Sequence, residues 1–128
     1  MRIEHLAIWV QDLEAMKEFY LQFFEVTANE RYHNPSKSFS SYFLTFPEGT
    51  RIELMHRPDI TKTVIKSVQQ IGYAHMAISV GSRSTVDQFT QKVRNSGYEV
   101  VGEPRTTGDG YYESVIADPE GNLIEITI

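Results

Sequence analysis

Four side chains that can bind a divalent metal occur at corresponding places in two similar halves of the chain. They are His5, Glu53, His75 and Glu125. Imidazole nitrogens and carboxylate oxygens suit first-row metals such as Zn²⁺, and four of them leave room for water or a substrate oxygen. A single histidine or glutamate in a strand is more often structural or exposed to solvent. The metal hypothesis therefore depends on whether the surrounding elements bring the four residues to one face.

An internal repeat relates the two halves. The segment I-E-H-L-A-I-W-V at 3–10 aligns with Y-A-H-M-A-I-S-V at 73–80, which places the two histidines 70 positions apart. The segment P-E-G-T-R-I-E-L at 47–54 aligns with P-E-G-N-L-I-E-I at 119–126, which places the two glutamates 72 positions apart. Each half therefore carries one histidine near its start and one glutamate near its end.

The repeat predicts an α+β fold in which two βαβββ modules, about 1–57 and 73–128, form one curved mixed sheet. Neither half is long enough to bury a core alone, so we expect one domain, 1–128. A linker containing Pro58, with a short helix near 61–70, is expected between the modules.

The helices and hairpins of the modules follow from spacing. Two sets of apolar residues recur at helical spacing, and they are Leu13, Met16, Tyr20, Phe23 and Phe24 in the first half and Val86, Phe89 and Val93 in the second. Asp12 is expected to cap the first helix, and Gly97 to end the second. Segments 41–47 with 50–56, and 111–118 with 122–128, are expected to form hairpins through turns with Pro early and Gly late.

Strand alternation predicts which face each side chain occupies, because residues two apart share a face. The rows expected to pack under the helices are Leu6, Ile8 and Val10; Ile52 and Leu54; Met76, Ile78 and Val80; and Ile124, Ile126 and Ile128. The four metal candidates alternate with these rows, so the sequence predicts a metal site on the face away from the helices. Two other histidines lack repeat partners: His33 is expected in a loop, and His56 has the opposite parity to Glu53 and is expected to be structural or exposed.

Composition excludes several classes of protein. The net charge of −5 and the lack of a basic patch argue against a nucleic-acid partner. The absence of cysteine excludes disulfides and fits a reducing, cytoplasmic location. No apolar run reaches membrane-spanning length, and charges interrupt the N-terminal run, so neither a membrane anchor nor a signal peptide is expected. The expected partner is a small molecule.

Three motifs carry a resemblance to a known group of proteins: I-E-H-L-A-I-W-V, G-Y-A-H-M-A-I-S-V and D-P-E-G-N-L-I-E-I. Over essentially its whole length the chain resembles the vicinal oxygen chelate superfamily, which contains glyoxalase I, extradiol dioxygenases, fosfomycin-resistance thiol transferases and bleomycin-binding proteins. The dioxygenases and fosfomycin transferases typically use three metal ligands, and bleomycin-type binders generally lack the set. The four residues His5, Glu53, His75 and Glu125 match the four-ligand pattern of glyoxalase I.

The resemblance implies a metal-dependent isomerase of the lactoylglutathione lyase type. Such an enzyme converts the hemithioacetal of a thiol and a 2-oxoaldehyde, such as methylglyoxal, into a hydroxyacyl thioester. One Ni²⁺, Co²⁺ or Zn²⁺ per site would polarise the substrate oxygens, and Glu125 would move the proton, with Glu53 as ligand and second candidate. Family members of this length are commonly homodimers in which each site uses one module from each subunit.

The substrate-binding residues are less well defined by the resemblance. Trp9 could form a wall of the pocket or be a buried core aromatic. Arg105, in the loop 103–112, could hold an anionic end of the substrate or be exposed on a flexible hairpin. Tyr111 and Tyr112 alternate faces, so at most one of them, expected to be Tyr111, lines the pocket.

Two alternatives stand beside the isomerase. Glutathione-using glyoxalases carry an arginine near the first strand and an asparagine after the second ligand, whereas this chain has Trp9 and the sequence H-R-P-D at 56–59, with Arg57 as a loose substitute. The thiol is therefore open, and another superfamily enzyme, such as a thiol transferase or acyl-thioester epimerase, fits the same ligands. A non-catalytic protein that binds an aromatic or glycopeptide ligand in a tyrosine-rich groove is the second alternative.

Overall fold

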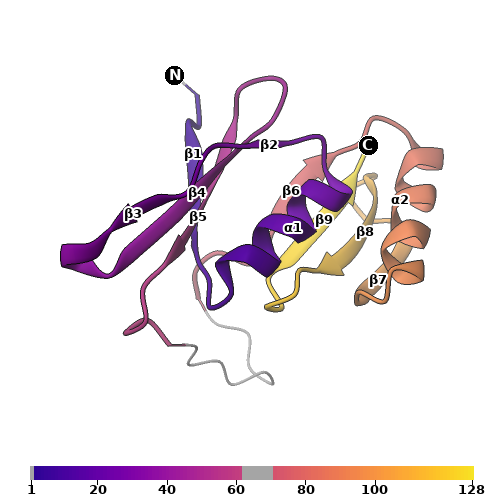
Figure 1. Ribbon diagram of the computed structural model, residues 1–128. Coiled ribbons are helices and arrows are strands. Elements are labelled where there is room, and N and C mark those ends of the chain that lie inside the picture. The colour runs from indigo at the N-terminus through magenta and orange to yellow at the C-terminus, as the bar shows by residue number, and fades with distance from the viewer. Residues whose placement is uncertain (1, 62–70) are drawn as a thin grey trace. The chain divides into compact units, whose positions relative to one another are not determined.

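The computed structural model describes residues 2–61 and 71–128, and the chain divides into two compact units, Met1–Lys66 and Ser67–Ile128 (Figure 1). The short helix expected near 61–70 falls, from position 62 onward, outside the described residues. Within the described ranges, no helix combines the length and the apolar character needed to cross a membrane.

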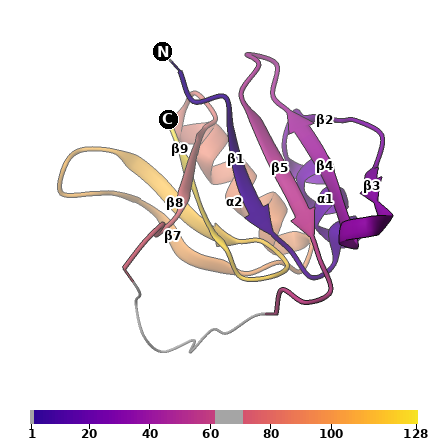
Figure 2. The ribbon, with the colours of Figure 1, turned by 90° about the vertical axis from the view of Figure 1, so that its left-hand side faces the viewer.

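The first unit is a mixed sheet with one helix. Its elements are β1 (His5–Trp9), α1 (Leu13–Phe23), β2 (Thr27–Ala28), β3 (Tyr32–Asn34), the 3-10 turn η1 (Pro35–Lys37), β4 (Phe39–Thr45) and β5 (Arg51–His56). The strand order is β1-β5-β4-β2, and β3 also pairs with β4. β1 runs parallel to β5, the other pairs are antiparallel, and α1 packs on β4 and β5. Figure 2 shows β1, β5 and β4 side by side.

The second unit repeats this plan. Its elements are β6 (Met76–Ser79), α2 (Arg83–Asn95), β7 (Val100–Thr106), β8 (Tyr112–Ala117) and β9 (Leu123–Thr127). The strand order is β6-β9-β8-β7, β6 is parallel to β9, and α2 packs on β7 and β8. The predicted α+β class is confirmed. Among the described residues the strands hydrogen-bond in two mixed sheets, one in each unit.

Side-chain caps begin both helices. The Asp12 carboxylate accepts a hydrogen bond of 2.9 Å from the backbone N–H of Ala15, as predicted, and the Ser82 hydroxyl accepts one of 3.2 Å from Thr85. Gly97, at φ +82°, takes the left-handed conformation that commonly follows a helix. The fully buried apolar and aromatic side chains of the helices are Met16, Phe19 and Tyr20 in α1 and Val86 and Val93 in α2.

The duplicated Pro-Glu-Gly segment forms the same turn twice. The N–H of Gly49 donates to the Phe46 carbonyl at 2.9 Å, and the N–H of Gly121 donates to the Asp118 carbonyl at 2.9 Å. Both glycines have positive φ, +91° and +83°, which side chains rarely adopt. The predicted hairpins β4–β5 and β8–β9 are therefore confirmed, with turns of one geometry.

The strand that precedes β4 is interrupted, which the sequence pattern did not reveal. β2 and β3 both pair with β4, and between them the Asn29 side-chain oxygen accepts a hydrogen bond of 2.7 Å from the backbone N–H of Phe43. A side chain thus replaces one backbone partner in the ladder. His33, expected in a loop, lies in β3, so that prediction was wrong.

Burial along the central strands follows the predicted alternation. Ile52 and Leu54 in β5, and Ile124 and Ile126 in β9, are at most 1% exposed, while the residues between them are half-buried. Ile128, expected in the same row, is 42% exposed because β9 ends at Thr127. Each sheet therefore has one buried face, and the glutamates alternate with the buried residues.

Candidate metal centre

The first unit brings His5 and Glu53 together. Nε2 of His5 lies 3.8 Å from Oε2 of Glu53, and their side chains are 38% and 16% exposed. In the parallel pair of β1 and β5, the residue opposite Glu53 is Ala7, two positions after His5. The histidine and the glutamate therefore sit diagonally on the same face of the sheet.

The second unit contains the equivalent pair. Nε2 of His75 lies 3.1 Å from Oε2 of Glu125, with side-chain exposures of 41% and 19%. In the parallel pair of β6 and β9, Ala77 lies opposite Glu125, again two positions after the histidine. The repeat thus preserves the pairing of a nitrogen and an oxygen donor.

The separation between the donor atoms of each pair can be compared with that of two ligands on one metal ion. Metal bonds of about 2.0 to 2.2 Å place neighbouring ligand atoms about 3 to 3.5 Å apart in tetrahedral or octahedral geometry. The separation at His75 and Glu125 lies in that range, and the one at His5 and Glu53 is slightly wider. Over residues 2–61 and 71–128, no three side chains of His, Cys, Asp or Glu lie close enough to hold a metal. Each unit by itself thus supplies a pair of donors.

His5 has a neighbour that sequence reasoning missed. Nδ1 of His5 lies 2.5 Å from Oε2 of Glu4, and Glu4 also forms an ion pair with Arg51. The hydrogen bond from His5 is the main cause that holds the pKa of the Glu4 carboxyl below its usual value, with the Arg51 guanidinium acting in the same direction. Alternation alone places Glu4 on the opposite face from His5, but β1 begins only at His5, so the rule does not extend to Glu4.

Trp9 lies on the same face as His5 and is 42% exposed, so the alternative of a buried core aromatic is wrong. Its ring meets the Phe39 ring edge-on, with centroids 6.1 Å apart, and the Tyr32 and Phe39 centroids are 6.0 Å apart. Tyr32 lies opposite Ser41, which shares a face with Phe39. Neither Tyr32 nor Phe39 was predicted for this face, because β3 was not expected and the following strand was expected to begin only at residue 41.

Arg105, a predicted substrate-binding residue, lies in β7 opposite Glu113 of β8. Its guanidinium is 3.7 Å from the Glu113 carboxylate, which is 9% exposed as a residue. Val115, two positions along β8, lies opposite Glu125. Glu113, which sequence reasoning also missed, therefore shares a sheet face with Glu125.

Tyr111 precedes β8 and is 56% exposed, whereas the Tyr112 hydroxyl donates a 2.7 Å hydrogen bond to Asp87 on α2. Tyr111 is thus exposed, and Tyr112 packs toward the helix. The hairpin before them is closed by hydrogen bonds from Thr107 N–H to the Tyr111 carbonyl (2.8 Å) and from Gly110 N–H to the Thr107 carbonyl (3.0 Å). This segment is therefore a hydrogen-bonded turn.

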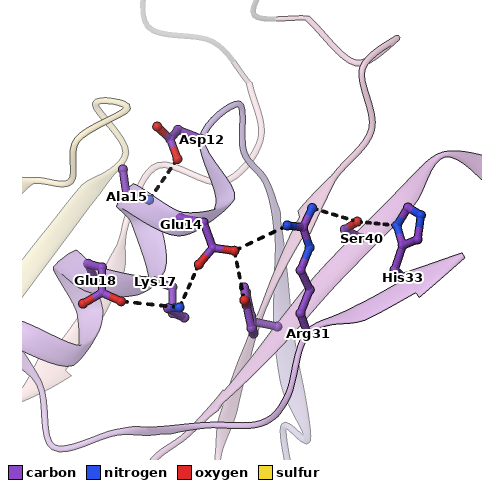
Figure 3. A network of polar contacts seen from close by, with 9 residues as sticks. Asp12, Glu14, Ala15, Lys17, Glu18, Arg31, His33 and Ser40 are labelled. Atoms are coloured by element: carbon purple, nitrogen blue, oxygen red, sulfur yellow. Dashed lines mark hydrogen bonds and ion pairs between the residues drawn. The ribbon is translucent and has the colours of Figure 1, made fainter. Parts of the chain in front are cut away.

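The other two histidines, His33 and His56, contact residues outside the two candidate metal-binding pairs. Nδ1 of His33 lies 2.9 Å from the Ser40 hydroxyl. The same hydroxyl accepts a hydrogen bond from Arg31, which also forms an ion pair with Glu14 of α1 (Figure 3). Ser40 has the parity of the buried row, so His33 does not contact the face that carries Glu53. Nδ1 of His56 lies 3.0 Å from the Val10 carbonyl oxygen, which confirms its structural role.

The chain matches the Glyoxalase/Bleomycin resistance protein/Dioxygenase superfamily over residues 2–126 and belongs to that superfamily. The match covers both units and all four metal candidates, so the resemblance noted from the motifs is confirmed.

Individual relatives agree with this assignment. Protein YqjT of Bacillus subtilis (strain 168) is 26% identical over 97% of this chain and 96% of its own length. The glyoxylase/bleomycin resistance protein/dioxygenase domain from Frankia sp. superposes with a TM-score of 0.83 at 16% identity, over 100% of this chain and 97% of that one. A V278E mutant of glyoxalase I from Zea mays gives 0.79 at 21% identity over 98% of this chain, which spans 44% of the maize protein. At these identities the solved structures establish the fold.

Proposed function

We propose that this protein is a metal-dependent glyoxalase I-like isomerase, which converts the hemithioacetal of a thiol and a 2-oxoaldehyde into a hydroxyacyl thioester. The observation that carries the proposal is the equivalent pairing of His5 with Glu53 and of His75 with Glu125. Membership of a superfamily that includes such enzymes supports the reaction class.

In this proposal the two pairs together hold one divalent ion, Ni²⁺, Co²⁺ or Zn²⁺. The two pairs come either from one chain or from two chains of a homodimer. The homodimer is the arrangement expected from the family resemblance. A bound metal ion would polarise the oxygens of the substrate. Its ligands would be two nitrogens and two carboxylate oxygens, which leaves positions for those oxygens.

Glu125 is the proposed acid–base residue. Its carboxylate would take a proton from one carbon of the hemithioacetal and return it to the neighbouring carbon, acting first as base and then as acid. The side chain is only 19% exposed, so it is partly shielded from bulk water. Glu53, 16% exposed, is the second candidate. Trp9, Arg105 and Tyr111 are the proposed substrate-binding residues.

The test begins with metal content, measured by mass spectrometry on wild type, Glu125→Gln and the exposed-turn control Glu48→Gln. Thioester formation from methylglyoxal and several thiols is then followed with added Ni²⁺, Co²⁺ or Zn²⁺. We expect one metal per site in wild type and turnover that is lost in Glu125→Gln but kept in Glu48→Gln. A wild-type protein that binds none of these metals would overturn the proposal.

Bound metal without turnover would assign the function to another superfamily reaction, such as thiol transfer or acyl-thioester epimerisation. Those reactions use the same Lewis-acid chemistry on different substrates. The assay therefore includes acceptor epoxides and acyl thioesters as substrates of these two classes.

A non-catalytic binder is favoured by one specific observation. The rings of Trp9 and Tyr32 both contact the Phe39 ring on the face of the first unit that carries His5, and Trp9 and Tyr32 are 42% and 51% exposed. Such rings can stack on an aromatic ligand. Binding of an aromatic ligand to metal-free protein, with no turnover in any metal, would favour this function.

A further inference from the structure

We infer that Glu4 is a positioning residue that orients His5 for metal binding. The inference rests on the proposed function, because it assigns Glu4 a role at that metal site. Glu4 would not touch the metal or the substrate, since its contact is with the far side of the imidazole ring.

The hydrogen bond fixes which nitrogen of His5 is free. A carboxylate only accepts hydrogen bonds, so the nitrogen that contacts Glu4, Nδ1, carries the hydrogen. In neutral imidazole the other nitrogen then has the lone pair. That nitrogen, Nε2, is the one that faces Glu53 at 3.8 Å. A carboxylate behind a metal-binding histidine commonly sets the tautomer and raises the basicity of the ligand in this way.

Three further contacts hold Glu4 and His5 in place. Arg51 pairs with the second carboxylate oxygen of Glu4, and its guanidinium lies over the Phe43 ring, 4.1 Å from the centroid. The His5 ring meets the same Phe43 ring edge-on, with centroids 5.5 Å apart and planes at 90°. The four side chains thus form a closed set of contacts, which limits rotation of the imidazole.

The second unit lacks this arrangement. The repeat places Ala74 at the position of Glu4 and Leu123 at the position of Arg51. Neither side chain can accept a hydrogen bond or form an ion pair. The two histidines therefore differ: both have a glutamate near Nε2, and His5 also has the carboxylate of the preceding residue at Nδ1.

The experiment compares wild type with three variants. Glu4→Ala removes the acceptor, and Glu4→Gln keeps an acceptor oxygen without the charge. The double variant Glu4→Ala, Arg51→Leu removes the carboxylate and its cation together, so the net charge stays the same. Glu48→Ala, on the exposed turn of the same unit, is the charge-matched control for the single variants.

Two readouts are measured on each protein. The first is the tautomer of His5 in metal-free protein, from side-chain ¹H–¹⁵N correlation spectra at a pH where imidazole is neutral. The second is the dissociation constant for Ni²⁺ alone, from equilibrium dialysis. We expect the Nδ1–H form in wild type and a shift toward the Nε2–H form in Glu4→Ala, with affinity reduced by about 10 to 100-fold. Glu4→Gln should be intermediate, and the double variant should resemble Glu4→Ala.

The outcomes separate this inference from the proposed function. Wild-type metal binding with an unchanged tautomer and affinity in Glu4→Ala overturns the role of Glu4 and leaves the metal site intact. If Glu4→Ala loses affinity and the double variant has the wild-type affinity, the loss is a simple effect of net charge, and this outcome also overturns the role of Glu4. A third outcome is that wild type binds no Ni²⁺ while the Nδ1–H form of His5 is still lost in Glu4→Ala. That result would support the hydrogen bond between Glu4 and His5 and overturn its role in metal binding.

Discussion

Nε2 of His75 lies 3.1 Å from Oε2 of Glu125, and the residues at the same repeat positions in the first unit, His5 and Glu53, are 3.8 Å apart. In both units the histidine stands two positions before the alanine that pairs with the glutamate across parallel strands. Two residues along a strand return to the same face, so the register of β1 and β5 accounts for the first pair. His75 lies just before β6, and the structure places it next to Glu125 in the same diagonal relation. The feature that the chain repeats is therefore an imidazole beside a carboxylate.

Replacement of either histidine should remove metal binding. His5→Ala and His75→Ala each delete a nitrogen donor, and the loss of Ni²⁺ affinity should exceed the roughly 100-fold that removal of an outer hydrogen-bond partner can cause. His33→Ala is the matched control, because that histidine contacts Ser40 in the separate network of Figure 3. Equilibrium dialysis of the three variants checks this, and equal affinity in all of them would contradict the assignment of His5 and His75.

Thr90 and Ser114 should show strong coupling in a double-mutant cycle. Their buried hydroxyl oxygens are 2.6 Å apart, and Thr90 also donates to the Val86 carbonyl at 2.7 Å. Thr90→Val leaves the Ser114 hydroxyl buried without that partner, which should cost about 1 to 3 kcal/mol in the free energy of unfolding. Adding Ser114→Ala should recover part of this loss. Urea unfolding of the four proteins gives the cycle, and additive effects would contradict the prediction.

Ile126→Ala should destabilise the protein strongly. The side chain is fully buried beside Glu125 in β9, so its loss leaves a cavity and should cost about 2 to 5 kcal/mol. Ile128→Ala is the control from the same segment, because Ile128 is 42% exposed and its replacement should change stability by no more than about 0.5 kcal/mol. The measurement is the midpoint of denaturant unfolding for each variant, with the slope of unfolding free energy against denaturant concentration unchanged. Similar losses in both variants would show that burial does not determine the cost.

Asp118 should add a pH dependence to stability. Burial raises the pKa of its carboxyl above the ordinary value of 3.8, although Asn122 and the Glu120 N–H donate to it and act in the opposite direction. Between the unfolded and the raised folded pKa, the folded state binds more protons than the unfolded state. Stability therefore falls as pH rises through this window.

Asp118→Asn removes the titration at this position. Unfolding free energies of wild type and variant, compared between about pH 3 and pH 7, should show wild type losing stability relative to the variant as the pH rises. Subtracting the two curves cancels the other carboxyl groups. A difference that is flat, or that rises with pH, would refute the role of buried Asp118.

Much of the fold and of the candidate site could be predicted from local signals. Asp12 and Gly97 mark helix ends through their own chemistry, and the two Pro-Glu-Gly turns depend on glycines at positive φ. The errors occurred where an element's limits depend on distant partners. His33 lies in a strand because β3 pairs with β4, and Ile128 is exposed because β9 ends one residue earlier.

The sequence by itself determined which face of its strand carries His5, Glu53 and Glu125, because alternation is a property of the strand. It could not determine register, since a shift of two residues keeps every side chain on its face while changing its neighbour. Only the tertiary structure decided that each histidine lies diagonally next to its glutamate. It also decided that Glu4 reaches His5: Glu4 lies just before β1, its carbonyl oxygen accepts a hydrogen bond of 3.2 Å from the Arg51 N–H, and its carboxylate pairs with the Arg51 guanidinium while contacting His5.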